Sequence, residues 1–254
     1  MDYLKIKSIT PDPVLESIAE FRFKASVPDD AVFGIVYNCL KEQFPTPPLA
    51  LPLLSIPEPI RGQDLSLKYK PLYVLKSKEN LQVQIGPRVI SVNRDTSSPY
   101  MGWTKFSEHL SEIVGKIFKT EVFEEVERTA VRYISFFKDI NIFDHLKLNV
   151  SLESVEYITK GNSSFETEIK EDKVMSRLRI DNSATLNRVG MDAYKGSIVD
   201  IDSYSTEKYK EAHKLLDLVG KCHSTEKRLF FSLLREDFLA KLNPEYENTK
   251  GKQS

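Results

Sequence analysis

Apolar and polar residues alternate in the first part of the chain with two different periods. Residues 14–25 alternate one by one, which predicts a strand whose two faces differ in polarity. In residues 28–44 and 103–118 the apolar side chains have helical spacing, which predicts two amphipathic helices. Further strands are predicted at 65–76, 80–86, 88–94 and 127–138. The first half therefore has the predicted order β-α-β-β-β-α-β.

The segment 45–59 separates the first helix from the strands that follow it. It contains six prolines, which lack the backbone N–H that helices and central strands need. We therefore expect a long extended connection here.

The second half is richer in strands and ends in helices. Alternating patterns predict strands at 147–158, 164–171, 174–181 and 197–204, with a weaker one in 185–194. Ser205 and Thr206 can cap a helix over 206–222, and a second helix is expected from Ser224 to Leu242, before Pro244. Strands with hairpin-length turns, separated by long helices, predict an α+β fold with antiparallel sheets and a C-terminal helical pair. We expect two similar halves, 1–140 and 141–246, and a polar mobile tail, 247–254.

Composition limits the class of protein. The chain has 254 residues, 41% apolar and 29% charged, with a formal net charge of −1. This balance fits a folded globular protein and gives no broad positive surface for nucleic acid or an anionic membrane. Neither cysteine belongs to a C-x-x-C pair, and the four histidines lack the spacing of a metal site. No signal sequence and no run of 18 apolar residues occurs, so a cytoplasmic protein is expected.

Two strand segments carry candidate chemistry. In SIVDIDSY (197–204), Asp200 and Asp202 share a strand face, with side chains about 6.5–7 Å apart. In FETEIK (165–170), Glu166, Glu168 and Lys170 form an E-x-E-x-K pattern that resembles the signature of the triphosphate tunnel metalloenzymes.

Arginines follow in SRLRI (176–180), where Arg177 and Arg179 share a face. Together with the carboxylates they could hold Mg²⁺ or Mn²⁺ and grip a phosphate. The motif lies in mid-chain, however, and too few strands follow it to close a tunnel. The alternative is structural: these carboxylates line a solvated strand face or pair across the sheet, Asp200 and Asp202 with Arg177, Arg179 or Arg188. We favour the structural alternative.

The last predicted helix has a wide apolar face that includes Phe230, Leu234 and Phe238. We expect this face to pack on the second sheet. If part of it stays exposed, it becomes a candidate surface for a protein partner or a second copy of the chain.

Several stretches occur together in one order: PDPVLESIAEFRF, GWTKF, VERTAVRYI, IVDIDSY and HSTEKRLFFSLLREDFLAKLNPEY. In this the chain resembles a sporadically distributed prokaryotic family of about this length that has no assigned activity. The resemblance implies a stand-alone protein and is compatible with mobile elements, such as defence or toxin–antitoxin loci. It supplies no catalytic residues.

The leading hypothesis is a binding or regulatory protein that recognises a protein partner, without a cofactor and with a homodimer as one arrangement. The alternative is a phosphate- or nucleotide-handling protein that depends on a divalent metal.

Overall fold

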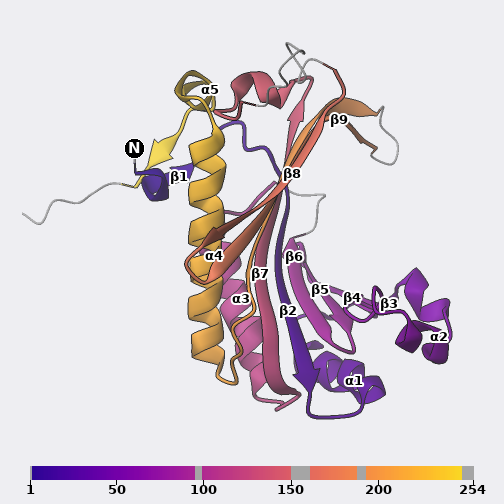
Figure 1. Ribbon diagram of the computed structural model, residues 1–254. Helices are drawn as coiled ribbons and strands as arrows, with labels where there is room; N and C mark the ends of the chain where they lie inside the picture. The colour runs from indigo at the N-terminus through magenta and orange to yellow at the C-terminus, as the bar shows by residue number, and fades with distance from the viewer. Residues whose placement is uncertain (1, 95–98, 150–160, 188–192, 248–254) are drawn as a thin grey trace, which may run out of the picture.

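A single long antiparallel sheet organises the protein (Figure 1). The computed structural model describes residues 2–94, 99–149, 161–187 and 193–247. Nine strands pair in the order β3-β4-β5-β6-β2-β7-β10-β9-β8, and a separate pair joins β1 to β11. The strands of the long sheet are β2 (Val14–Ala25), β3 (Leu49–Ala50), β4 (Tyr73–Lys76), β5 (Leu81–Gly86), β6 (Val89–Arg94), β7 (Phe123–Lys138), β8 (Ser164–Glu171), β9 (Val174–Leu186) and β10 (Tyr194–Ser205). The small pair consists of β1 (Ile6–Ser8) and β11 (Glu245–Tyr246).

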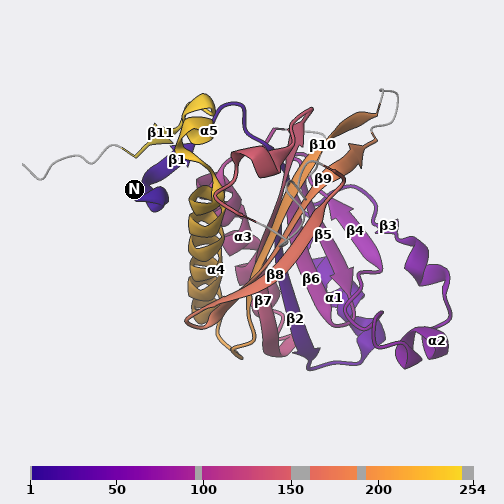
Figure 2. The same cartoon turned by 45° about the horizontal axis from the view of Figure 1, so that its top comes forward.

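Helices cover one face of the sheet, as both views show (Figures 1 and 2). They are α1 (Asp29–Leu40), α3 (Trp103–Phe118) and the long α4 (Ala212–Leu233), which is followed by the short α5 (Glu236–Lys241). A further short helix, α2 (Glu58–Gln63), lies away from the sheet, and 3-10 turns occur at η1 (Tyr3–Lys5), η2 (Pro52–Ser55) and η3 (Ile142–His145). The predicted α+β fold with antiparallel strands and C-terminal helices is confirmed.

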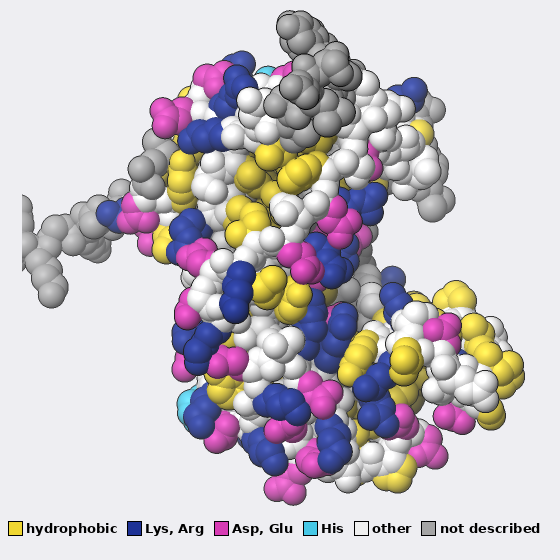
Figure 3. Space-filling view, viewed as in Figure 1, with side chains coloured by type: hydrophobic (Ala, Val, Ile, Leu, Met, Phe, Trp, Pro, Cys, Tyr) yellow, Lys and Arg dark blue, Asp and Glu magenta, His cyan; other side chains and the backbone are white. Residues whose placement is uncertain are grey.

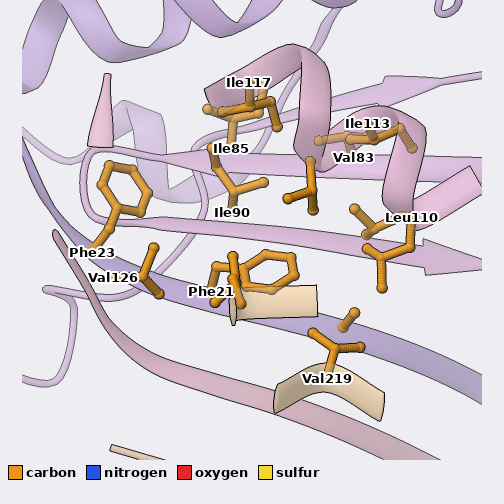
Figure 4. Packing of buried hydrophobic residues seen from close by; sticks show 14 of the residues in the cluster. Phe21, Phe23, Val83, Ile85, Ile90, Leu110, Ile113, Ile117, Val126 and Val219 are labelled. Atoms are coloured by element: carbon orange, nitrogen blue, oxygen red, sulfur yellow. The ribbon is translucent and has the colours of Figure 1, made fainter. Parts of the chain in front are cut away.

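The core divides into two clusters that follow the length of α4. In the larger cluster, Phe21 and Phe23 of β2 pack with α3 side chains such as Leu110 and Ile113, and Val219 of α4 closes one side (Figure 4). The smaller cluster gathers Leu178, Ile180 and Ile201 of the second-half strands around the C-terminal helices. Every second residue on β2, β9 and β10 points to the helix-covered side of the sheet, so the opposite face of these strands carries their polar side chains.

Strands from the two predicted halves meet within the same sheet. β7 pairs with β2 on one side and with β10 on the other, both antiparallel. The boundary at residue 140 lies just after β7, so the long sheet continues across it. The division into two domains stays a prediction.

The C-terminal helices differ from the prediction. Residues 206–211 are not helical, because Tyr209 forms a bridge with Val126 of β7. One helix, α4, then runs through the expected break at His223, since its buried side chains keep helical spacing from Leu215 to Phe231. It ends where Leu234 leaves the helix to form a bridge with Leu146.

Several other segments are shorter than predicted. Of the expected strand 65–76 only β4 is extended, because a turn fixed by Asp64 (Ser66 N–H donates to Oδ1, 2.8 Å) precedes it. The proline-rich segment contains the two-residue edge strand β3 and η2 and runs into the start of α2. Of the weak strand expected at 185–194, residues 185–186 end β9 and Tyr194 begins β10, and 188–192 lie outside the described residues. Most of the expected strand 147–158, and nearly all of the tail 247–254, lie outside the described residues. None of the described helices has the length and apolar character needed to cross a membrane.

Candidate functional site

The charged residues predicted from the sequence come together on the sheet face that the helices leave uncovered. On β10 and β9, Asp200 lies opposite Arg179, and Asp202 lies opposite Arg177. The next strand continues the row, because Glu166 of β8 lies opposite Arg179 and Glu168 opposite Arg177. Figure 3 shows dark blue and magenta side chains intermixed beside β8 and β9. Lys170 lies further along β8, exposed and opposite Met175.

The two aspartates bond mainly to arginines of β7, which the sequence prediction did not include. The Arg132 guanidinium donates two hydrogen bonds to Asp200, from Nε at 2.8 Å and from Nη2 at 2.6 Å. This hydrogen bond to Asp200 raises the pKa of Arg132 above its ordinary value. Arg128 donates to Asp202 at 2.7 Å and to Glu20 of β2 at 2.8 Å. The aspartates are therefore paired across the sheet, but with Arg132 and Arg128 of β7 and not with the expected Arg177 or Arg179.

The outer strands form weaker pairs of their own. Arg177 Nη2 lies 2.9 Å from Glu168 and its Nε lies 3.7 Å from Glu166, while Arg179 lies 3.5 Å from Asp181. These side chains are mostly exposed, so solvent screens their charges. Arg188, the third predicted partner, lies outside the described residues.

We call this row of residues the charge ladder: Glu20, Arg128, Arg132, Asp200, Asp202, Arg177, Arg179, Glu166 and Glu168. Acidic and basic side chains alternate from strand to strand, which stabilises neighbouring strands across the sheet. Among the described residues, no three His, Cys, Asp or Glu side chains are placed to hold a metal ion together. The ladder lies on an open sheet face, and arginines donate to both carboxylate oxygens of Asp200 and to Oδ2 of Asp202. This arrangement favours the structural alternative.

The predicted apolar face of the last helix is buried. Phe230, Leu234 and Phe238 all belong to the smaller core cluster. This agrees with the expected packing on the second sheet and leaves no exposed apolar surface at these three positions for a partner.

Exposed apolar side chains occur instead on an arm formed by residues 49–72. Of the six large apolar residues that are exposed in the described parts of the chain, three lie on this arm: Leu49, Ile60 and Leu65. Leu65 is 82% exposed. Figures 1 and 2 show the arm, which includes α2, projecting from the sheet on the side away from α4, and Figure 3 shows yellow side chains gathered on it.

Backbone contacts attach the arm to the sheet. Leu72 N–H donates to the Ile85 carbonyl at 2.8 Å, and Leu51 N–H donates to the Leu72 carbonyl at 2.8 Å. Next to this contact, a Cβ atom at Gly86 would lie 2.4 Å from the Lys70 carbonyl oxygen. Glycine is therefore needed at this position, because any side chain would push the arm away.

A groove of about 630 Å³ separates the arm from α1 and the β5–β6 turn. Its apolar surface includes Phe33 and Tyr73, whose rings stack with centroids 3.7 Å apart, and Leu54 and Leu65 of the arm. Charged residues of both signs also line it: Asp29, Asp30, Glu58, Arg61, Lys68, Lys70 and Arg88. Arg88 and Asp29 pair at 3.3 Å. A partner would therefore meet an apolar groove with a mixed charged border.

The sequence pattern did not predict this groove. Leu65 and Leu67 appear there as parts of an alternating strand, and only the three-dimensional structure shows that they lie on a projecting turn. No protein-family model and no curated protein sequence matches the chain, so its function is inferred from this geometry.

Proposed function

We propose that the protein is a binding component that recognises another protein through the arm and the groove beside it. The observation that carries this proposal is the concentration of exposed apolar side chains on the arm, next to a groove of about 630 Å³. Apolar patches of this kind on a folded protein commonly mark interaction sites. The occupant we propose is a partner segment that inserts an apolar side chain between Phe33 and Leu65.

The charge ladder also favours a binding component over a metal-dependent phosphate-handling protein. A metal-dependent phosphate site needs carboxylates whose oxygens converge on a cavity and are available to a cation. In the ladder the Asp200 and Asp202 oxygens accept hydrogen bonds from Arg132 and Arg128 on an open face. We therefore propose no metal cofactor for this protein.

The experiment compares an arm variant with a matched control. Ile60→Asp/Leu65→Asp places two charges on the arm, and Ile169→Asp places one at an exposed apolar position on β8. All three positions are exposed, so the melting temperatures of both variants should stay close to that of the wild type. A photo-crosslinking residue at position 65, and in parallel at 169, identifies the partner in the cells that naturally produce the protein.

The proposal predicts a partner that crosslinks at position 65 but not at 169. Its affinity should fall at least about tenfold in the arm variant and stay unchanged in Ile169→Asp, because buried apolar anchors dominate binding energy. Unchanged affinity for the arm variant would refute the proposal. If position 65 crosslinks only to a second copy of the chain, the arm is a homodimer interface and not the site of a different protein. Sedimentation would then show a dimer.

A further inference from the structure

A second cavity, of about 100 Å³, lies between the N-terminal segment, β7 and α4. It shares no residue with the charge ladder or the groove. Five aromatic side chains line it: Tyr100, Trp103, Tyr133, Phe230 and Phe231. The hydroxyl groups of Tyr100 and Tyr133 form a hydrogen bond with each other, with their oxygens 2.7 Å apart. We call this cavity the Glu226 pocket, after the acidic residue in its wall.

Two polar groups in the wall of the pocket lack hydrogen bonds to the described parts of the chain. Glu226 is only 5% exposed, and no described residue forms a hydrogen bond with its carboxyl group. One helical turn earlier, His223 stacks on Trp103 with ring centroids 3.7 Å apart, and its Nδ1 atom is buried without a hydrogen-bond partner among the described residues. Buried polar groups are costly unless they are hydrogen-bonded. The pocket therefore has the properties of a site completed by a ligand.

These two groups are uncharged at neutral pH. Burial raises the pKa of Glu226 to about 8 and lowers the pKa of His223 to about 3. A protonated carboxyl group presents one donor and one acceptor side by side.

The charged groups around the pocket are Lys7, Asp12, Arg94 and Lys227. Three of them bond to the protein itself: Lys227 Nζ donates to the Leu4 carbonyl, Arg94 donates to the Leu15 carbonyl, and Asp12 accepts from Val14 N–H. Lys7 is exposed at the outer edge. Lys227 is only partly buried, whereas the buried polar groups of the wall, Glu226 and His223, are the neutral ones.

We propose that the Glu226 pocket binds a small uncharged molecule with an apolar body and an amide head, and that the Glu226 carboxyl group pairs with this head. A neutral carboxyl group and an amide match because each offers one donor beside one acceptor. The aromatic wall receives the apolar body, and the volume admits a body of a few carbon atoms.

The chain offers a direct reporter, because Trp103 is its single tryptophan and lines the pocket. Tryptophan fluorescence is titrated with isobutyramide, isobutyrate and isobutylammonium, which share an apolar body and differ in charge. We expect isobutyramide to change the fluorescence with a dissociation constant on the order of 1–10 mM, because the binding energy of a ligand is limited by its number of atoms. The two charged probes should bind at least about tenfold more weakly, because the pocket would have to desolvate their charge.

Two variants assign the effect to Glu226. Glu226→Gln keeps an uncharged donor and acceptor, so it should bind isobutyramide at pH 7, whereas Glu226→Leu should lose binding at least about tenfold. In the wild type, isobutyramide stabilises the protonated carboxyl group, so its affinity should fall about tenfold from pH 7 to pH 9 as Glu226 ionises. Glu226→Gln should show no such fall.

Three results would overturn the proposal: no fluorescence response to isobutyramide up to about 100 mM, equal or tighter binding of a charged probe, or wild-type binding by Glu226→Leu. Thermal melts establish that each variant is folded. If Glu226→Leu does not fold, the pH dependence of isobutyramide affinity in Glu226→Gln tests the proposal instead. An affinity that falls from pH 7 to pH 9 as much as in the wild type would refute the role of Glu226.

Discussion

The substitution Asp200→Asn tests whether the charge ladder is part of the fold. Arg132 donates two hydrogen bonds to the Asp200 carboxylate, at 2.8 and 2.6 Å. Asparagine keeps one carbonyl oxygen but places an NH₂ group where the second oxygen lay, so a donor then faces a donor. Hydrogen bonds to charged groups contribute about 1.5–3 kcal/mol each. The Asp200 side chain is 14% exposed, but the Arg132 side chain is 42% exposed, which places the loss at the lower end of that range.

We therefore expect Asp200→Asn to lower the free energy of unfolding by about 1.5–2 kcal/mol. Urea denaturation measures this as a fall in the midpoint of roughly 0.5–1 M, for a slope of about 2–3 kcal/mol per M. Glu166→Gln is the matched control, because the Glu166 side chain is 58% exposed and lies 3.7 Å from Arg177. Its effect should stay below about 0.5 kcal/mol.

One pair of results would refute this reasoning. Asp200→Asn would be as stable as the wild type, and tripolyphosphate with Mn²⁺ would stabilise the wild type but not Asp200→Asn/Asp202→Asn. The aspartates would then be ligands of a metal–phosphate site, and the arginines would be phosphate contacts.

Three further predictions concern the core and its ionisable groups. Leu234→Ala should lower the free energy of unfolding by about 2–4 kcal/mol, because Leu234 is buried in the smaller cluster. Thermal or urea denaturation measures this change, and a loss below about 1 kcal/mol would contradict the packing. A thiol reagent should modify the partly exposed Cys39 first and Cys222 only on unfolding, since burial raises the pKa of Cys222 to about 12; equal rates in the native protein would contradict the prediction. Between pH 6.5 and 8 the wild type should lose about 1.6 kcal/mol of stability that Glu226→Gln keeps, as measured by urea denaturation. The sign follows because folding raises the pKa of Glu226, so the unfolded state has already released a proton that the native state retains up to about pH 8. His223 opposes this slope only below pH 6.5, because folding lowers its pKa; parallel curves for the two proteins would contradict the prediction.

The sequence predicted those elements whose pattern is local. β2 occupies residues 14–25 as expected, and α3 follows the expected 103–118, since each has one apolar face that a neighbouring element covers. The break expected near residue 223 was wrong because the polar residues there resemble a helix cap, while the buried face of α4 continues past them. The end of α4 is set by the bridge between Leu234 and Leu146. It therefore depends on a partner far away in the chain.

The candidate site was predictable only in part. The alternating pattern placed Asp200 and Asp202 on one polar strand face, and pairing with arginines was expected. The order of strands decides which arginines lie beside them, and a pattern of period two carries no information about that order. β7 therefore supplied Arg128 and Arg132, although Arg177 and Arg179 are nearer in the chain. The Glu226 pocket combines β7, α4 and the N-terminal segment, and these come together only in the folded chain.

The position of β7 between β2 and β10 has a consequence for synthesis of the protein. When the ribosome has made β7, its β2 neighbour is present, but residues 194–205 of β10 are not. One long edge of β7 then stays unpaired while the intervening residues are translated, on the order of several seconds at about 5–20 residues per second. Unpaired strand edges invite association with other chains. The nascent chain should therefore be most dependent on chaperones in this interval, before β10 closes the middle of the sheet.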